Sequence, residues 1–470
     1  MISFWQAVEI TVFGFNLMIL AYFLGLNGYY LFLSTMSVIQ LVRFKIRRIG
    51  RRRKLEKHPF LPSVSILSPA YNEEQTIAES LSSLIKVNYP KLDIIVVNDG
   101  SIDGTLKELK KVFKLRKSKR KGSGKLPSAK IRGVYRSGKY DNLFVIDKEN
   151  GGKADALNAG INLSRSDLFC AIDADSILDR DALMRLVEDY MTKGSNVVAL
   201  GGIVRIANGC EIKNGEVISV RAPKRILPGL QVVEYIRAFL CGRSGFNLIN
   251  SLLIISGAFG LFRRDSVIEV GGYDSSTVGE DMELVTRLHR HMRKERRDYR
   301  ILFVPDPICW TQAPDSLSVL KRQRNRWQRG LLESIIMNRE MILNPRYGTV
   351  GMVAVPFFLF FEGVGPFFEV MGYLIVIISI IFGWINVSFF FLFLFLAVIL
   401  GVILTMFALI MEEVTVKKYH NLGDIGKLLL LGILENIGYR QLVTIWRMKG
   451  LWDFVRGNKA WGKMTRKRFN

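Results

Sequence analysis

A long apolar run near the N-terminus constrains this chain more than any other feature. Residues 8–42 carry a single charge, Glu9, and exceed the roughly 20 residues that cross a bilayer as a helix. The run lacks the basic start and the small-residue cleavage site of a signal peptide. The basic block that follows, 43–57, favours the cytoplasmic side. We therefore expect a first segment, 1–57, to comprise one membrane-spanning helix with its N-terminus outside and a basic flank.

A second apolar region follows residue 348 and predicts further membrane helices over 349–446. A basic tail, 447–470, favours a cytoplasmic C-terminus and hence an even number of later crossings, two or four. Residues 317–337 and 349–361 are alternatives for helices that lie along the interface instead. Glu435 and Arg440 are costly in lipid, so we expect them to face a bundle interior or an aqueous path.

The charge balance predicts an anionic environment. Lys and Arg outnumber Asp and Glu by 66 to 42, which gives a net charge of +24. The basic blocks flank apolar segments, as membrane proteins require, so we expect a lipid bilayer and no nucleic acid as partner. We expect the basic insert 114–141 to be a solvated arm with no further role. Four scattered cysteines and four histidines argue against a zinc site and for buried, reduced thiols in a cytoplasmic domain.

Between 58 and 312 the pattern becomes one of short apolar runs that alternate with helical stretches, which predicts a cytoplasmic α/β domain. Strands are expected over the ranges 63–73, 93–101, 142–153 and 168–176, with a helix over 74–86. Each strand ends in polar residues and glycine. In open α/β sheets ligands gather at these carboxyl ends. The fold class is therefore a Rossmann-like α/β domain combined with transmembrane and interface helices.

Polar side chains at successive strand ends should meet in one crevice: Asn72, Asp99, Lys153, Asp173 and Asp175. Helix capping is an equal alternative for any one of them, and Asp103 fits that role. The carboxylates of "DAD" (173–175) point the same way from an extended chain and suit Mg²⁺ or Mn²⁺. Lys153, after the double glycine of "NGGK", suits a diphosphate.

The ordered set of motifs carries a family resemblance. It comprises "PAYNE", "VNDGSIDGT", "NGGKADALNAG", "DAD", "SGAFGLFRRD", "GGYD…GEDMEL" and "QRNRW", followed by membrane helices. This chain resembles the family-2 inverting glycosyltransferases with a GT-A fold, which include processive membrane synthases of cellulose, hyaluronan and chitin. Bacterial poly-β-1,6-N-acetylglucosamine synthases are the most similar branch. The segment 313–348 holds the Q-x-x-R-W signature.

The resemblance implies a role for each residue that matches a motif. Asp281 would be the catalytic base, Asp175 with Asp173 would hold Mg²⁺ or Mn²⁺, and Trp327 would stack on the acceptor sugar. The implied donor-binding residues are Asn72, Glu73, Asp99, Lys153, Asp173, Gln323 and Arg326. Two simpler interpretations compete. "GED" also suits the positive end of a helix dipole, and "QRNRW" also suits an interfacial helix anchored by Trp. Gly279 departs from the family pattern, because many relatives have Thr there.

The implied function is processive synthesis of a β-linked polysaccharide from a UDP-sugar, UDP-N-acetylglucosamine first of all. Glucose, or the alternating sugars of hyaluronan, are the alternatives within the same fold. A non-catalytic membrane scaffold that senses nucleotide is a third hypothesis. The expected partners are the UDP-sugar, the growing polysaccharide and the bilayer, and an auxiliary membrane subunit is compatible with the resemblance. We expect a multi-pass protein of the cell membrane.

Overall fold

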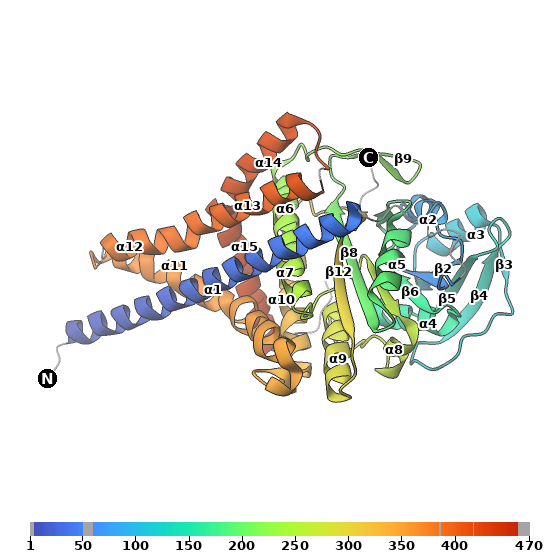
Figure 1. The fold of residues 1–470 in the computed structure, drawn as a ribbon, viewed down its shortest axis with the longest axis horizontal. Coiled ribbons are helices and arrows are strands. Elements are labelled where there is room, and N and C mark those ends of the chain that lie inside the picture. The colour runs from blue at the N-terminus through green and yellow to red at the C-terminus, as the bar shows by residue number, and fades with distance from the viewer. Residues whose placement is uncertain (1–3, 50–59, 385–386, 417, 459–470) are drawn as a thin grey trace.

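The computed structural model of the chain describes residues 4–49, 60–384, 387–416 and 418–458. Two parts lie end to end along the longest axis: an α/β part around one large sheet and a bundle of long helices (Figure 1). The rest of the predicted basic flank beyond residue 49 and residues 459–470 of the predicted tail lie outside the described residues.

Ten strands form one mixed sheet, in the order β3-β4-β5-β2-β1-β6-β11-β8-β12-β7. Their bounds are β1 Val64–Ala70, β2 Leu92–Asp99, β3 Leu115–Lys117, β4 Ile131–Ser137, β5 Leu143–Lys148, β6 Leu168–Ala171, β7 Ile177–Leu178, β8 Val197–Ile206, β11 Gly260–Arg263 and β12 Arg300–Thr311. Strands β5, β2, β1 and β6 run parallel to one another, which confirms the four predicted strands. They are mostly apolar and almost entirely buried, because helices cover both faces of the sheet. A separate hairpin pairs β9 Glu211–Lys213 with β10 Glu216–Ser219.

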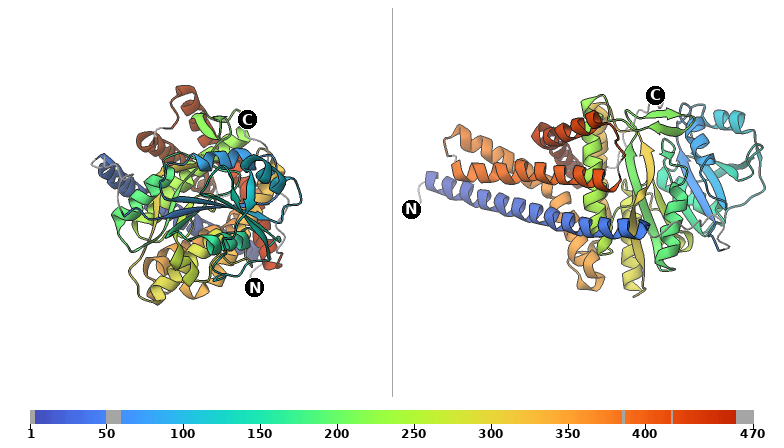
Figure 2. Two further views of the ribbon diagram at one scale, coloured as in Figure 1. Left: turned by 90° about the vertical axis from the view of Figure 1, so that its right-hand side faces the viewer. Right: turned by 45° about the horizontal axis from the view of Figure 1, so that its top comes forward.

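The helices of the α/β part surround this sheet (Figure 2). Their bounds are α2 Ile77–Ile85, α3 Thr105–Phe113, α4 Lys153–Leu163, α5 Ala182–Lys193, α8 Arg264–Glu269 and α9 Glu280–Lys294. The predicted helix over 74–86 is confirmed as α2. Helix α9 has three acidic residues in its first turn and three basic residues in its last, the distribution that complements a helix dipole.

The basic insert 114–141 is a solvated arm only in part. Residues 118–130 form a largely exposed connection, as predicted, whereas β3 and β4 on either side of it belong to the sheet. Strand β4 pairs with β5, and β3 pairs with β4 to form one edge of the sheet. Arg120 anchors the connection between them, because its guanidinium lies 2.9 Å from Asp93 and 4.3 Å from the centroid of the Phe144 ring. The edge strand β3 carries Arg116 and Lys117, and charged side chains on an edge strand discourage pairing with another chain. The basic residues of the neighbouring connection concealed both strands in the sequence.

Three long apolar helical rods run beside one another away from the sheet (Figures 1 and 2). They are α1 Phe4–Ile49, α11 Gly365–Ile381, and the continuous run of α12 Val387–Leu394, η7 Phe395–Ile399 and α13 Leu400–Thr415. Phe23 of α1 meets Phe393 of α12 edge to face, with ring centroids 5.3 Å apart. Ile19, Leu26 and Ile375 share the same buried cluster. The rods therefore pack on one another as well as presenting apolar side chains outward.

Further helical segments adjoin the sheet and these rods. They are α6 Ile226–Arg237, η2 Ala238–Arg243, α7 Ser244–Leu248, α10 Leu317–Met337, η3 Arg339–Met341, η4 Pro345–Tyr347, η5 Val350–Ala354 and η6 Phe357–Gly363. Helix α10 carries the "QRNRW" motif, and it packs against both α9 and α15. The predicted interface segment 349–361 continues into α11 as one long apolar helix, Val350–Ile381.

The last helical stretch is broken in the middle. It consists of α14 Leu422–Leu434, η8 Glu435–Tyr439 and α15 Arg440–Val455. Ile437 and Gly438 leave helical geometry, with φ values of −117° and 89°. Glu435 is buried and accepts hydrogen bonds from Arg237 at 2.7 and 2.9 Å, as expected of a carboxylate that faces a bundle interior.

By length and composition, four helices of the described chain could cross a membrane: Ile10–Ile46, Val350–Ile381, Phe390–Thr415 and Leu422–Val455. Three of them follow the α/β part, where two or four crossings were expected. The last is the broken one, and its halves of 13 and 16 residues are each shorter than the roughly 20 residues of a crossing. All four cysteines are buried and free, as predicted.

Candidate active site

The loop that carries Lys153 is fixed by Asp99, at the end of β2. The Asp99 carboxylate accepts hydrogen bonds from the backbone N–H groups of Gly151 at 3.0 Å and Gly152 at 2.8 Å, and it pairs with the buried ammonium of Lys148. Gly152 has a φ of 87°, which glycine adopts without strain. The chain can therefore turn sharply here, and Lys153 becomes the first residue of α4.

Lys153 points at carboxylates from two other parts of the chain. Its Nζ atom lies 2.5 Å from Asp173 and 3.7 Å from Glu280. Burial lowers the pKa of Lys153, but the charges of Asp173 and Glu280 outweigh it and hold that pKa above its ordinary value. Lys153 is therefore a cation at neutral pH, placed beside the predicted metal ligands.

Asp281 approaches the same backbone segment as Lys153, at Gly257. Its carboxylate accepts a hydrogen bond from the Gly257 N–H at 3.0 Å and one from the Met282 N–H at 2.9 Å. A Cβ atom at Gly257 would stand 2.7 Å from the Lys153 ammonium and 3.5 Å from the Asp281 carboxylate. Gly257 thus allows a cation and a carboxylate to approach the same backbone. Asp281 is half-buried, whereas the neighbouring Glu280 is buried, and burial raises the pKa of Glu280.

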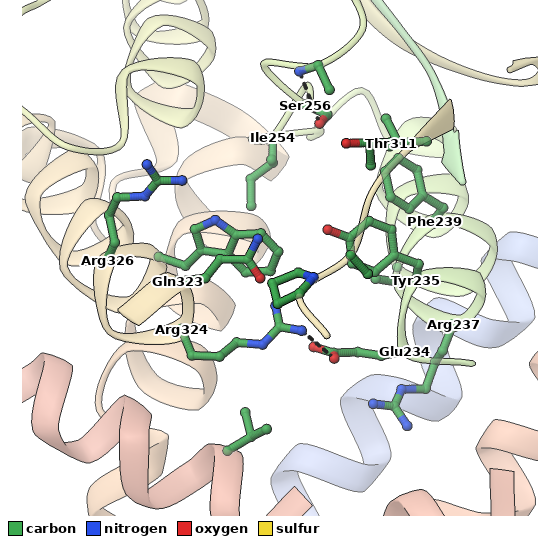
Figure 3. A pocket seen from close by; sticks show the side chains of 18 of the residues that line it. Glu234, Tyr235, Arg237, Phe239, Ile254, Ser256, Thr311, Gln323, Arg324 and Arg326 are labelled. Carbon is green, nitrogen blue, oxygen red and sulfur yellow. Dashed lines mark hydrogen bonds and ion pairs between the residues drawn. The ribbon is translucent and has the colours of Figure 1, made fainter. Parts of the chain in front are cut away.

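One cavity of 1090 Å³ joins these residues to α10. Its lining includes eight of the predicted site residues and neighbours: Lys153, Asp173, Asp175, Glu280, Asp281, Gln323, Arg326 and Trp327. Figure 3 shows Gln323, Arg324 and Arg326 on one side, facing Glu234 and Tyr235 of α6. Trp327 is 43% exposed, so its indole face is open to a bound molecule. The cavity continues between the long helices, where Tyr30, Glu369 and Arg440 line it.

Asn72, Glu73 and Asp99 do not line this cavity. Asn72 accepts a hydrogen bond from the Ile102 N–H at 2.9 Å, and Glu73 accepts one from the Thr76 hydroxyl at 2.6 Å. The Asn72 contact joins the loops after β1 and β2, whereas the Glu73 contact lies within the loop after β1. Their roles toward a nucleotide stay predictions.

Asp173 and Asp175 fit a divalent cation that brings further ligands with it. Burial raises the pKa of Asp175, and the charge of Asp173 adds to this effect. Across the described ranges, no group of three or more His, Cys, Asp or Glu side chains is arranged around a metal position. Mg²⁺ is commonly held by one or two carboxylates together with waters and substrate phosphates. Two carboxylates beside Lys153 are that kind of donor set.

Comparison with known proteins agrees with this geometry. Residues 65–271 match the profile of glycosyl transferase family 2, and residues 274–434 match that of chitin synthase. Residues 65–271 are therefore a glycosyl transferase family 2 domain, and the protein is a glycosyltransferase.

Curated relatives indicate which group of glycosyltransferases this chain is similar to. The glycosyltransferase is 29% identical over 336 residues to a poly-β-1,6-N-acetyl-D-glucosamine synthase of Staphylococcus aureus, strain COL, covering 70% of this chain and 69% of the relative. It is 29% identical over 274 residues to the enzyme of the same name from Staphylococcus epidermidis, covering 58% and 56%. The resemblance to processive membrane synthases is thereby confirmed.

A solved structure supports the fold. A mannosyltransferase from Pyrobaculum calidifontis, in complex with GDP-Man and Mn²⁺, matches the glycosyltransferase with a TM-score of 0.50 and 16% identity. The match covers 94% of this chain and all of the other. At that identity the likeness concerns the fold alone, and it confirms the predicted GT-A class.

Motif reasoning missed several charged residues of the cavity. Arg324 lies inside "QRNRW" but outside the signature, and it pairs with Glu234 at 2.6 Å. Arg237 of α6 pairs with Glu435. The partners lie 90 and 198 residues apart, so no local pattern links them. The sequence feature that could have indicated one of these pairs was Glu435, because a charged residue in an apolar segment needs a partner.

Proposed function

We propose that this glycosyltransferase is a processive, inverting synthase. It uses UDP-N-acetylglucosamine to build a β-linked polysaccharide and passes that polymer across the membrane in which it is embedded. The observation that carries the proposal is the single cavity, which runs from Lys153 and Asp281 past Trp327 to Arg440 between the long helices. The names of the curated relatives support the choice of sugar.

In the proposed reaction Asp281 takes the proton of the acceptor hydroxyl as the new bond forms. A sugar hydroxyl is a weak nucleophile at neutral pH, so a positioned carboxylate is needed. The hydroxyl attacks the anomeric carbon from the face opposite UDP, which converts an α-linked donor into a β-linked product. Two backbone N–H groups hold the Asp281 carboxylate in place and leave its half-buried side toward the cavity.

Fixed cations receive the diphosphate that leaves. Lys153 is protonated and lies at the N-terminus of α4, a position that favours anions. Arg326 supplies a planar guanidinium suited to phosphate oxygens, and Gln323 supplies an amide from the same face of α10. Mg²⁺ or Mn²⁺ held by Asp175 and Asp173 would neutralise part of the charge on the diphosphate.

The continuation of the cavity between the long helices is the proposed exit path. Its lining combines aromatic rings with hydrogen-bonded polar groups. Arg447 binds Glu362 at 2.7 Å, and Thr444 binds Glu369 at 2.8 Å. Sugar hydroxyl groups need such partners once they have left water, and a purely apolar path would not supply them.

Donor specificity tests the proposal. Purified full-length protein in detergent or nanodiscs would be offered UDP-N-acetylglucosamine, UDP-glucose and UDP-glucuronic acid, singly and in pairs, with one radiolabelled sugar each time. We expect label in large product from UDP-N-acetylglucosamine alone. Polymer made from UDP-glucose, or only from a pair of donors, would show that the enzyme uses another donor sugar with the same fold. No product from any donor, with no metal-dependent release of UDP, would favour the non-catalytic scaffold.

The proposed topology has the N-terminus outside, the α/β part in the cytoplasm, and two later crossings formed by Val350–Ile381 and Phe390–Thr415. Because the native cysteines are buried, single introduced cysteines report the side of the membrane. Gly383→Cys, after α11, should react with a membrane-impermeant reagent added outside, whereas Lys139→Cys should react only after lysis. The reverse pattern would overturn this topology.

A further inference from the structure

Helix α6 presents two opposite charges to the cavity. Glu234 and Arg237 lie three positions apart and so share one face of the helix. Both line the cavity between the site and the long helices (Figure 3). Their partners come from different parts of the chain.

These two residues hold the broken helix on either side of its break. Arg237 binds Glu435, which precedes the break, at 2.7 and 2.9 Å. Glu234 accepts a hydrogen bond from the Tyr439 hydroxyl, just after the break, at 3.0 Å. The residues between, Ile437 and Gly438, are the non-helical ones. Helix α6 therefore fixes the place and the direction of the break.

Glu234 also reaches the acceptor side of the active site. Its carboxylate accepts a hydrogen bond from the Arg324 guanidinium at 2.6 Å, and the Arg324 side chain is only 2% exposed. The carbon atom of that guanidinium lies 4.4 Å from the centroid of the Trp327 ring. The Tyr235 ring also lies near this indole, with its centroid 6.4 Å from that of Trp327. The open indole of Trp327 is thus backed by a cation whose own position depends on Glu234.

The hydrogen bonds of the Arg324 guanidinium argue against a purely structural ion pair between helices. A guanidinium paired with a carboxylate usually bonds through two parallel N–H groups. Here one nitrogen, Nη2, donates to Glu234, while Nε and Nη1 are buried and without hydrogen-bond partners in the described structure. The guanidinium instead lies over the indole ring of Trp327. Burying a cation in this way is costly unless its orientation serves another contact.

We propose that Glu234 and Arg324 are positioning residues for the acceptor. Together they set the orientation of Trp327, and through Tyr439 they tie that orientation to the broken helix of the exit path. This inference rests on the proposed function, because it assigns the acceptor's terminal sugar to Trp327. The pair keeps the acceptor hydroxyl at Asp281 in preference to water.

If this pair is disrupted, we expect UDP release to become uncoupled from the incorporation of sugar into polymer. When the acceptor is misplaced, a water oxygen attacks the anomeric carbon, the bond to the diphosphate breaks, and UDP leaves with free sugar as the other product. Asp281 takes the proton from water in that case. UDP release then exceeds sugar incorporation, and the polymers become shorter.

The test compares UDP released with labelled sugar found in polymer, together with polymer length, on purified full-length protein. Arg324→Lys keeps the charge and loses the planar face, and Glu234→Gln keeps the size and loses the charge. For both variants we expect the fraction of donor sugar that enters polymer to fall about tenfold, because small errors in placement are costly in transfer reactions. The KM for the donor should stay within about twofold, because neither residue contacts the diphosphate cations in this scheme.

Arg205 and Glu412 provide a matched control. They form another buried Arg–Glu pair between the sheet and a long helix, at 2.6 and 2.8 Å, and they do not line the cavity. Arg205→Gln should lower thermal stability while the fraction of sugar entering polymer stays at the wild-type value. Tyr439→Phe, which removes one hydrogen bond to Glu234, is the milder variant if the others do not fold, and it should shorten the polymer.

Wild-type coupling and length in Arg324→Lys and Tyr439→Phe would overturn the inference. So would an equal loss of coupling in Arg205→Gln, because the effect would then follow stability alone. Failure of the proposed function looks different, since the wild-type protein itself would make no polymer.

Discussion

Gly279 and Gly330 lie with their backbones in contact. A Cβ atom on Gly279 would stand 2.7 Å from the backbone of Gly330, and one on Gly330 would stand 2.7 Å from the Cα atom of Gly279. Gly279 directly precedes Glu280 and Asp281, and Gly330 follows Trp327 by about one turn of α10. The contact therefore sets the distance between Asp281, the proposed base, and the "QRNRW" cluster. It also accounts for a glycine at position 279, because a side chain there would meet the Gly330 backbone.

Gly330→Ala should separate these two segments. Neither backbone can move without shifting its helix, so we expect a loss of about 1–3 kcal/mol in stability. Activity should fall about 10²-fold, because Asp281 would no longer face the acceptor correctly. Thermal unfolding and polymer synthesis would be measured in parallel. Gly426→Ala, a helix glycine with open space around it, is the control and should behave as wild type.

Asp281→Asn should abolish polymer synthesis while UDP still binds. The amide can keep one hydrogen bond from the Gly257 N–H but cannot accept a proton, so we expect a loss of about 10²–10⁴-fold. Incorporation of label and calorimetric binding of UDP would be compared. Substantial polymer from this variant would reject Asp281 as the base.

The affinity for Mn²⁺ should rise with pH between 6 and 8. Burial and the charge of Asp173 raise the pKa of Asp175 to about 7, so below that pH a proton must leave before the carboxylate can bind metal. We expect up to about a tenfold weaker affinity per pH unit below 7. Electron paramagnetic resonance of free Mn²⁺ measures this directly. Asp175→Asn should bind weakly at every pH, and a flat wild-type profile would contradict the raised pKa.

His289 should make the folded state sensitive to acid. Its ring bonds to the Leu252 carbonyl, which can only accept, so Nε2 carries the proton and Nδ1 accepts from the Tyr299 hydroxyl. Burial lowers the pKa of His289 from 6.5 to about 4. Between these values the unfolded state binds a proton that the folded state does not, so stability falls as pH falls from 6.5 toward 4, by about 3 kcal/mol in total.

His289→Gln isolates this effect from other acid-sensitive groups. Its stability deficit relative to wild type should be largest at pH 7 and should shrink toward pH 5. Unfolding midpoints at several pH values would measure the difference. A deficit that does not depend on pH would rule out the histidine as its source.

Periodicity and motif order predicted the parallel strands, the two-part organisation and the meeting of Lys153, Asp173 and Asp281. These succeed because buried parallel strands are continuous apolar runs and because their ends share one edge. Ion pairs between residues far apart in the sequence could not be predicted. Glu234 and Arg324 are ordinary residues in sequence, and they become partners only because the fold places their side chains within hydrogen-bond distance. The edge strand β3 and its neighbour β4 were not recognised, because the lysine and arginine residues in and between them are typical of a loop.

The Arg237–Glu435 pair bears on how the protein is made. An acidic side chain that enters hydrocarbon without a partner is expelled or must be neutralised. The cation for Glu435 belongs to α6, which is synthesised some 198 residues earlier. During biogenesis the folded first half would already offer that guanidinium when the last apolar stretch leaves the ribosome, so the completed first half can guide the packing of the second.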